Sequence, residues 1–139
     1  MWNHGALGTV RFDETRAHLD LARSSGVLGY LHHQGALYVH LAGPGPAVIV
    51  LGERPPSSAY LVQASHRVTA WKREGARVAV ALAGLGEKVV EIGGLGANRD
   101  VAVEIRDAAG ARRERTRTGA DGRVTVRGGE VGAVEVRLG

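Results

Sequence analysis

Hydrophobic and polar residues alternate along most of this chain in short runs, with turn-forming residues between the runs. In "ALYVHLA", Leu37, Val39 and Leu41 share one face of a strand, and Tyr38 and His40 lie on the other. The same period of two recurs in "RVTAWKREGARVAVALAG", "VAVEIRD", "RVTVR" and "AVEVRLG". Such alternation is typical of half-buried β-strands. It predicts an all-β protein, a β-sandwich or jelly-roll-like fold of about ten to twelve short antiparallel strands.

Helix signals occur only in residues 13–23. Asp13 is a suitable N-cap, and the "RSSG" that begins at Arg23 is a suitable stop. An irregular loop fits the same residues. We therefore expect at most one short helix, near residues 13–23.

The glycine-rich stretch "GGLGANRD", residues 93–100, interrupts the strand pattern. The segment that follows it is small for an independent sandwich. We therefore expect one β-sandwich domain over residues 1–139, in which residues 93–100 are a candidate seam before a C-terminal β-hairpin extension.

Two hairpins have a register that the sequence predicts. A two-residue turn at 34–35 places His33 opposite Ala36 and His32 opposite Leu37. The less apolar face of this hairpin then carries Leu31, His33, Tyr38 and His40. In the second hairpin, a turn at Glu74 and Gly75 places Trp71 opposite Val78.

Three of the six histidines fall within "GYLHHQGALYVHL", residues 29–41, which raises the question of a metal site. Adjacent strand residues point to opposite sides, so His32 and His33 cannot readily bind one ion together. The chain also lacks cysteine and the motifs GxSxG and HExxH. We therefore expect no metal, no cofactor and no enzymatic activity.

Carbohydrate binding requires less, namely an aromatic ring that stacks on a sugar and a few hydrogen-bonding groups. Aromatic residues make up only 4% of the chain. Tyr38, flanked by His33 and His40, is the best exposed candidate. Trp71 is a second candidate, although packing in the core is the alternative that its apolar face favours. The predicted ligand-binding residues are thus Tyr38, His40, His33 and Trp71.

The net charge of +4 comes mainly from arginine, and eight arginines lie between Arg106 and Arg137. A solvated strand face and a patch for an acidic polysaccharide or a nucleic acid are both compatible with this cluster. No stacking aromatics are interleaved with it, so we expect no nucleic-acid partner. No apolar run approaches the roughly 20 residues that a membrane-spanning helix needs, so we expect no membrane partner.

Two segments together resemble a known family. They are residues 20–43, "DLARSSGVLGYLHHQGALYVHLAG", and residues 55–84, "PPSSAYLVQASHRVTAWKREGARVAVALAG". They are similar to the β-rich C-terminal accessory region of Pel-type exopolysaccharide deacetylase/hydrolase proteins. The matching residues are Asp20, Leu21, Ser24, Gly26, Val27, Gly29, Tyr30, Tyr38, Val39, His40, Leu41, Tyr60, Leu61, Val62, Val68, Trp71, Arg73, Gly75, Leu82 and Gly84. The sequence departs from the family pattern after Gly84, where it continues "LGEKVVEI".

The resemblance implies a non-catalytic, carbohydrate-binding-like accessory module of an exported polysaccharide-modifying protein. Its partners would be a polysaccharide or oligosaccharide and an adjacent deacetylase or glycosidase domain. Its location would be periplasmic or extracellular as part of a larger exported protein, although no signal peptide is recognisable in this sequence. The alternative is a structural β-domain that packs against a neighbouring enzyme domain and binds no ligand.

Overall fold

A computed structural model describes residues 8–13, 15–43, 45–74, 77–129 and 133–139 of the chain. Every regular element among these residues is a β-strand, so the predicted all-β fold is confirmed. The described residues form thirteen strands, slightly more than predicted. The strands are β1 (Gly8–Phe12), β2 (His18–Leu19), β3 (Val27–His33), β4 (Ala36–Leu41), β5 (Leu51–Gly52), β6 (Tyr60–Ala64), β7 (Arg67–Glu74), β8 (Arg77–Ala83), β9 (Lys88–Gly93), β10 (Asp100–Asp107), β11 (Gly110–Arg117), β12 (Val124–Gly128) and β13 (Ala133–Leu138).

The described part of residues 13–23 forms no helix. It contains the short strand β2, which pairs with β5, followed by a turn. The backbone N–H of Asp20 donates to the carbonyl of Val50 at 2.8 Å, and Leu19 is fully buried. Pairing with a distant strand thus takes the hydrogen bonds that a helix would have formed within itself.

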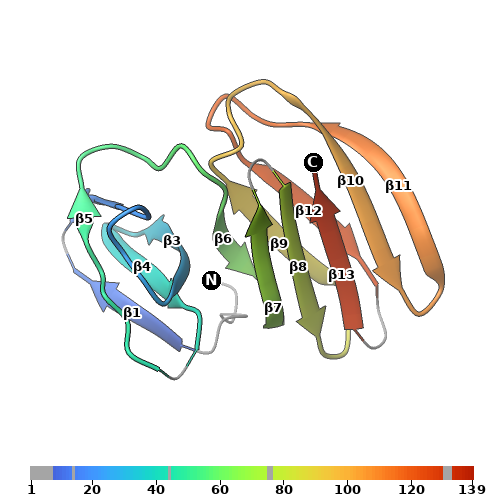
Figure 1. Cartoon of the computed structure of the whole chain (residues 1–139), viewed down its shortest axis with the longest axis horizontal. Coiled ribbons are helices and arrows are strands. Elements are labelled where there is room, and N and C mark those ends of the chain that lie inside the picture. Colours follow the sequence, from blue (N-terminus) through green and yellow to red (C-terminus); the bar gives the residue numbers. More distant parts are fainter. Residues whose placement is uncertain (1–7, 14, 44, 75–76, 130–132) are drawn as a thin grey trace.

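Strands β6 to β13 form a two-layered β-sandwich (Figure 1). One sheet has the order β11-β10-β13-β8-β7, and the other has the order β12-β9-β6. The alternating apolar residues predicted from the sequence point into the space between the layers. This sandwich core includes Leu61, Val78, Val80, Leu82, Val90, Ile92, Val101, Val103, Ile105, Val124, Val126, Val134, Val136 and Leu138.

Strands on either side of residues 93–100 pair with one another. β12 pairs with β9, and β13 lies between β8 and β10, so the C-terminal strands complete both layers of the sandwich. The loop itself is tied to the segment before β12. The buried hydroxyl of Thr118 donates to the carbonyl of Gly96 at 2.6 Å and accepts the N–H of Arg99 at 2.8 Å. Residues 93–100 are therefore an internal connection of the sandwich.

The first five strands lie beside the sandwich, next to β6 (Figure 1). They form a sheet of order β1-β4-β3 and the short pair β2-β5. β6 belongs to two cores, because Leu61 faces the sandwich core while Tyr60 and Val62 face the first five strands. The second core consists of Leu19, Tyr30, Leu31, Leu37, Val39, Tyr60 and Val62.

The backbones of β3 and β6 come unusually close at one point. A Cβ atom placed on Gly29 would lie 1.9 Å from the carbonyl oxygen of Leu61 and 2.5 Å from its nitrogen. No side chain can occupy that position. Leu28, the preceding residue of β3, reaches the sandwich core, so this approach joins the two parts of the molecule.

The register of the β3–β4 hairpin is the predicted one. His33 lies opposite Ala36, and His32 opposite Leu37. Gln34 and Gly35 both have positive φ, 50° and 78°, as a tight two-residue hairpin turn requires.

The predicted register of the β7–β8 hairpin is wrong. Glu74 is the last residue of β7 and pairs with Arg77, whereas the prediction placed Glu74 in the turn; Gly75 lies outside the described residues. Trp71 consequently lies opposite Val80 instead of Val78. Period-two alternation does not distinguish these registers when a turn can move along the chain.

We expect Gly29→Ala to destabilise the protein by about 3 kcal/mol or more, because backbone atoms of two strands would have to move apart. Urea unfolding followed by circular dichroism measures this change. Gly43→Ala is the matched control, since a Cβ there meets nothing within 4 Å. Equal stability of the two variants would contradict the close approach.

Candidate ligand-binding surface

Tyr38 and His33 are diagonal neighbours on the predicted face of the β3–β4 hairpin. Both side chains are half-buried. Arg11 on β1 lies opposite Tyr38, and its guanidinium lies 5.8 Å from the centre of the tyrosine ring. The same arginine forms an ion pair with Asp13 at 2.6 Å. The tyrosine therefore already has a cation over its ring, which reduces the area left for a sugar to stack on.

His40 shares this face but lies inside the protein, with 1% of its surface exposed. Its Nε2–H donates to the carbonyl of Val62 at 2.6 Å. Leu61 and Gln63 pair with two consecutive residues of β9, Ile92 and Glu91. Val62, which lies between them on β6, therefore has no partner of its own in the ladder and lies at a β-bulge. The histidine thus provides a hydrogen-bond donor for the Val62 carbonyl, where the ladder between β6 and β9 is irregular. This position favours a structural role for His40 over contact with a ligand.

Trp71 is half-buried and packs against the sandwich core from β7. It also borders a small cavity of about 260 Å³ beside the start of β3. The other residues that line this cavity are Leu21, Ser24, Ser25, Gly26, Val27, Leu28 and Arg73. Trp71 therefore lies apart from Tyr38 and His33, and the four predicted residues do not converge on one site.

A cluster of aromatic and histidine rings, which the sequence did not reveal, fills the junction between β2, β3 and β6. The rings of Tyr30 and Tyr60 stack with centroids 4.8 Å apart, and His18 Nδ1 is hydrogen-bonded to the Tyr30 hydroxyl at 2.8 Å. His32 Nε2–H donates to the carbonyl of Ala17 at 2.7 Å. His18 and Tyr60 are distant in the sequence from Tyr30, so strand alternation could not bring the three rings together.

Burial shifts the proton affinities within this cluster. It lowers the pKa of His18 below the ordinary value of 6.5, and the charges of His32 and Arg123 lower it further. Burial raises the pKa of Tyr30, and so does the neighbouring Tyr60. Both side chains are therefore held in their neutral forms. Their hydrogen bond therefore joins β2 to β3.

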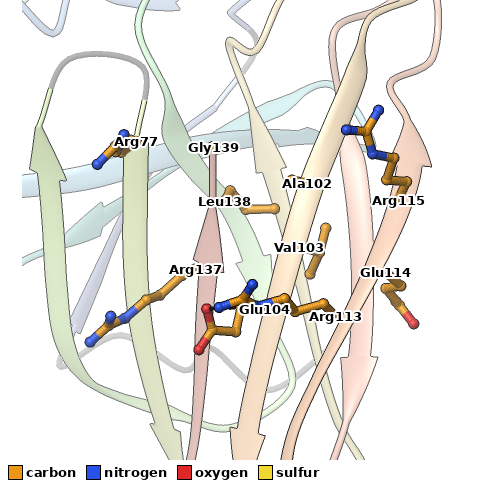
Figure 2. Close-up of a pocket in the computed structure, with 10 residues that line it drawn as sticks. All are labelled: Arg77, Ala102, Val103, Glu104, Arg113, Glu114, Arg115, Arg137, Leu138 and Gly139. Atoms are coloured by element: carbon orange, nitrogen blue, oxygen red, sulfur yellow. Dashed lines mark ion pairs between the residues drawn. The ribbon is translucent and has the colours of Figure 1, made fainter.

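A larger concave surface lies elsewhere, on the outer face of the five-stranded sheet. It is a groove of about 630 Å³ over β8, β13, β10 and β11 (Figure 2). The cations on this outer face are Arg67, Lys72, Arg77, Arg106, Arg113, Arg115, Arg117 and Arg137. The acidic residues there are Glu74, Asp100, Glu104 and Glu135. Among the described residues of this face, cations thus outnumber carboxylates by two to one.

Two arginines lie on opposite sides of the groove floor. Arg115 extends from β11 and Arg77 from β8, and Figure 2 shows them on opposite sides. Between them lie Ala102 and Gly139, whose backbones exchange two hydrogen bonds at 3.1 Å. Arg115 and Arg77 form no ion pair with any side chain in the described ranges. Small residues therefore make the floor, and two arginines that form no ion pair within the described ranges make the two sides.

The next row of the sheet mixes the two signs of charge. Glu104 lies opposite Arg113 on one neighbouring strand and opposite Arg137 on the other. Its carboxylate lies 2.6 Å from Arg106 and 3.7 Å from Arg113. The hydrogen bond from Arg106, together with the charges of the surrounding arginines, lowers the pKa of Glu104. This carboxylate stays ionised and available as a hydrogen-bond acceptor.

Metal ligands, membrane-spanning helices and similar proteins were each looked for in turn. Among the residues that the structure describes, no three histidine or acidic side chains are placed as metal ligands would be. The described residues also include no helix that is long and apolar enough to cross a membrane. Comparison with protein-family models, curated proteins and solved structures found no match for this chain.

We expect His40→Phe to destabilise the protein by about 1–3 kcal/mol, because the buried carbonyl of Val62 loses its donor. Thermal or urea unfolding measures the loss. His33→Phe is the control, since it makes the same substitution at a half-exposed position. Unchanged stability in His40→Phe, combined with a loss of glycan binding, would instead assign His40 to ligand contact.

We expect stability to fall as the pH drops from about 8 to about 5, partly because His18 resists protonation. The folded pKa lies below that of the unfolded chain, so the unfolded state binds the proton more readily. The stabilising contribution is therefore present above about pH 6.5 and is lost as the pH falls through the folded pKa. His18→Asn should flatten this slope in urea unfolding at several pH values. An identical slope in the parent and the variant would contradict the shift.

Proposed function

We propose that this chain is a non-catalytic module that holds a polysaccharide on the outer face of its five-stranded sheet, as an accessory part of an exported polysaccharide-modifying protein. The arginine-lined groove is the observation that carries the proposal. It combines concavity and exposure with an excess of cations over carboxylates, which together favour a partner that is negatively charged. The resemblance of residues 20–43 and 55–84 to an exopolysaccharide accessory region supports a glycan as that partner.

The positive charge of this face limits the kinds of glycan that it can bind. Removal of acetyl groups from an amino sugar leaves a positively charged amine, which the arginines of this face would repel. An acidic polysaccharide is attracted by the same arginines. The proposal therefore favours an acidic polymer over a deacetylated amino-sugar polymer.

The chemistry of the face also favours a glycan over a nucleic acid. Among its described residues the face has no aromatic side chain, because Trp71 points toward the sandwich core. Binding of single-stranded nucleic acids relies on such rings for base stacking. Glu104 and Glu135 would in addition repel phosphates, whereas they can accept hydrogen bonds from sugar hydroxyls.

A structural role is the second candidate, and a different surface favours it. Val48 and Leu51 are 54% and 37% exposed and belong to the apolar run "AVIVL" at residues 47–51. Exposed apolar residues of this kind can mark a contact with another protein surface. On this reading the segment would pack against a neighbouring enzyme domain.

We expect the intact chain to be retarded in affinity gels that contain an acidic polysaccharide, and to run unretarded in gels that contain a neutral one. Arg113→Gln/Arg137→Gln should weaken retention about tenfold or more, because two charge-assisted contacts are lost. Arg16→Gln/Arg54→Gln removes the same net charge from the first part of the chain and is the matched control. Equal weakening by both pairs, or retention by no polysaccharide, would overturn the proposal.

A further inference from the structure

The groove has a geometry that goes beyond a general attraction for anions. Its cations lie in two rows that run across the strands. One row holds Arg115 and Arg77 on either side of Ala102, and the adjacent row holds Arg113, Glu104 and Arg137. A ligand that touches both sides of the groove must therefore cross the strands from β11 toward β8.

The spacing of the strands fixes the separation of the cations. Neighbouring strands lie about 4.8 Å apart, so the backbones of β11 and β13 are separated by about 10 Å, and those of β11 and β8 by about 14 Å. Arg113 and Arg137 are thus placed for anionic groups that recur along an extended chain.

The residues of the two rows offer complementary hydrogen-bonding groups. The guanidinium of an arginine binds a carboxylate through two parallel hydrogen bonds. Glu104 is ionised between Arg113 and Arg137, and it can only accept hydrogen bonds. A ligand that fits both therefore carries carboxylates for the arginines and hydroxyl donors for Glu104.

We propose that the groove binds a polyuronate, a polymer of sugars that each carry a carboxylate and free hydroxyls, in an extended form across β11, β10, β13 and β8. Arg115 and Arg77 bind carboxylates on the two sides of the floor, and Glu104 accepts a sugar hydroxyl. Ala102 and Gly139 leave room for the sugar rings because neither projects a long side chain. This inference rests on the proposed function and specifies its ligand.

A substitution of Glu104 tests the proposal, because the two explanations predict opposite changes in affinity. Glu104→Ala removes a negative charge, so any site that recognises polyanions by charge alone should bind all of them more tightly. A polyuronate site should instead lose affinity for the polyuronate, because a hydroxyl loses its acceptor, while its affinity for a sulfated polymer rises. Urea unfolding of the variant checks that the fold is unchanged.

The experiment is isothermal titration calorimetry of the intact chain with four probes: sodium polygalacturonate, its fully methyl-esterified form, dextran sulfate and single-stranded DNA. We expect polygalacturonate to bind best and the neutral ester not to bind. Arg115→Lys/Arg77→Lys keeps the charge but loses the paired hydrogen bonds, and it should weaken polygalacturonate binding about tenfold. Arg16→Lys/Arg54→Lys is the matched control and should leave binding unchanged.

The outcomes separate the two proposals. If dextran sulfate binds as well as polygalacturonate, or if Glu104→Ala strengthens binding to both, the polyuronate inference is overturned and an acidic-polysaccharide module remains. If single-stranded DNA binds best, both the inference and the glycan function are overturned. If none of the probes binds, the groove is not a polyanion site and the structural role of the chain is favoured.

Discussion

The close approach of β3 to β6 is the constraint on which the arrangement of this protein depends. Gly29 permits it, because any side chain there would collide with the backbone of Leu61. His40, which pairs with Gly29 across the hairpin, reaches beyond it to the carbonyl of Val62. Gly29, which has no side chain, and His40, which hydrogen-bonds to β6, thus join the first five strands to the sandwich.

This junction determines which histidines and tyrosines remain available for function. It buries His40 and Tyr30, and it places His18 and Tyr60 in the same cluster of rings. His40, one of the four predicted ligand-binding residues, thus makes a hydrogen bond within this junction. Tyr38 and His33 remain half-buried on the other face of the hairpin, where Arg11 covers part of the tyrosine ring.

The outer face of the five-stranded sheet has no such structural task. The inward side chains of this sheet form the core, so its outward positions can carry charged side chains. The arginines there exceed what the carboxylates of the same face can neutralise, and two of them flank a floor of small residues. Excess cations on a surface reduce stability through mutual repulsion, which a bound anionic ligand would relieve. The face is for this reason the stronger candidate for binding.

The sequence by itself determined the fold class, the β3–β4 register and the inward faces of the later strands, because period-two alternation and a Gln34–Gly35 turn act locally. It misplaced the β7–β8 turn, and it favoured a helix or loop where β2 pairs with β5, since both depend on partners elsewhere in the chain. It identified an arginine-rich segment but could not place Arg77 beside it. Only the tertiary structure decided that His40 is buried and that Arg77 and Arg115 share a groove, because strand order brings together residues that alternation alone leaves unconnected.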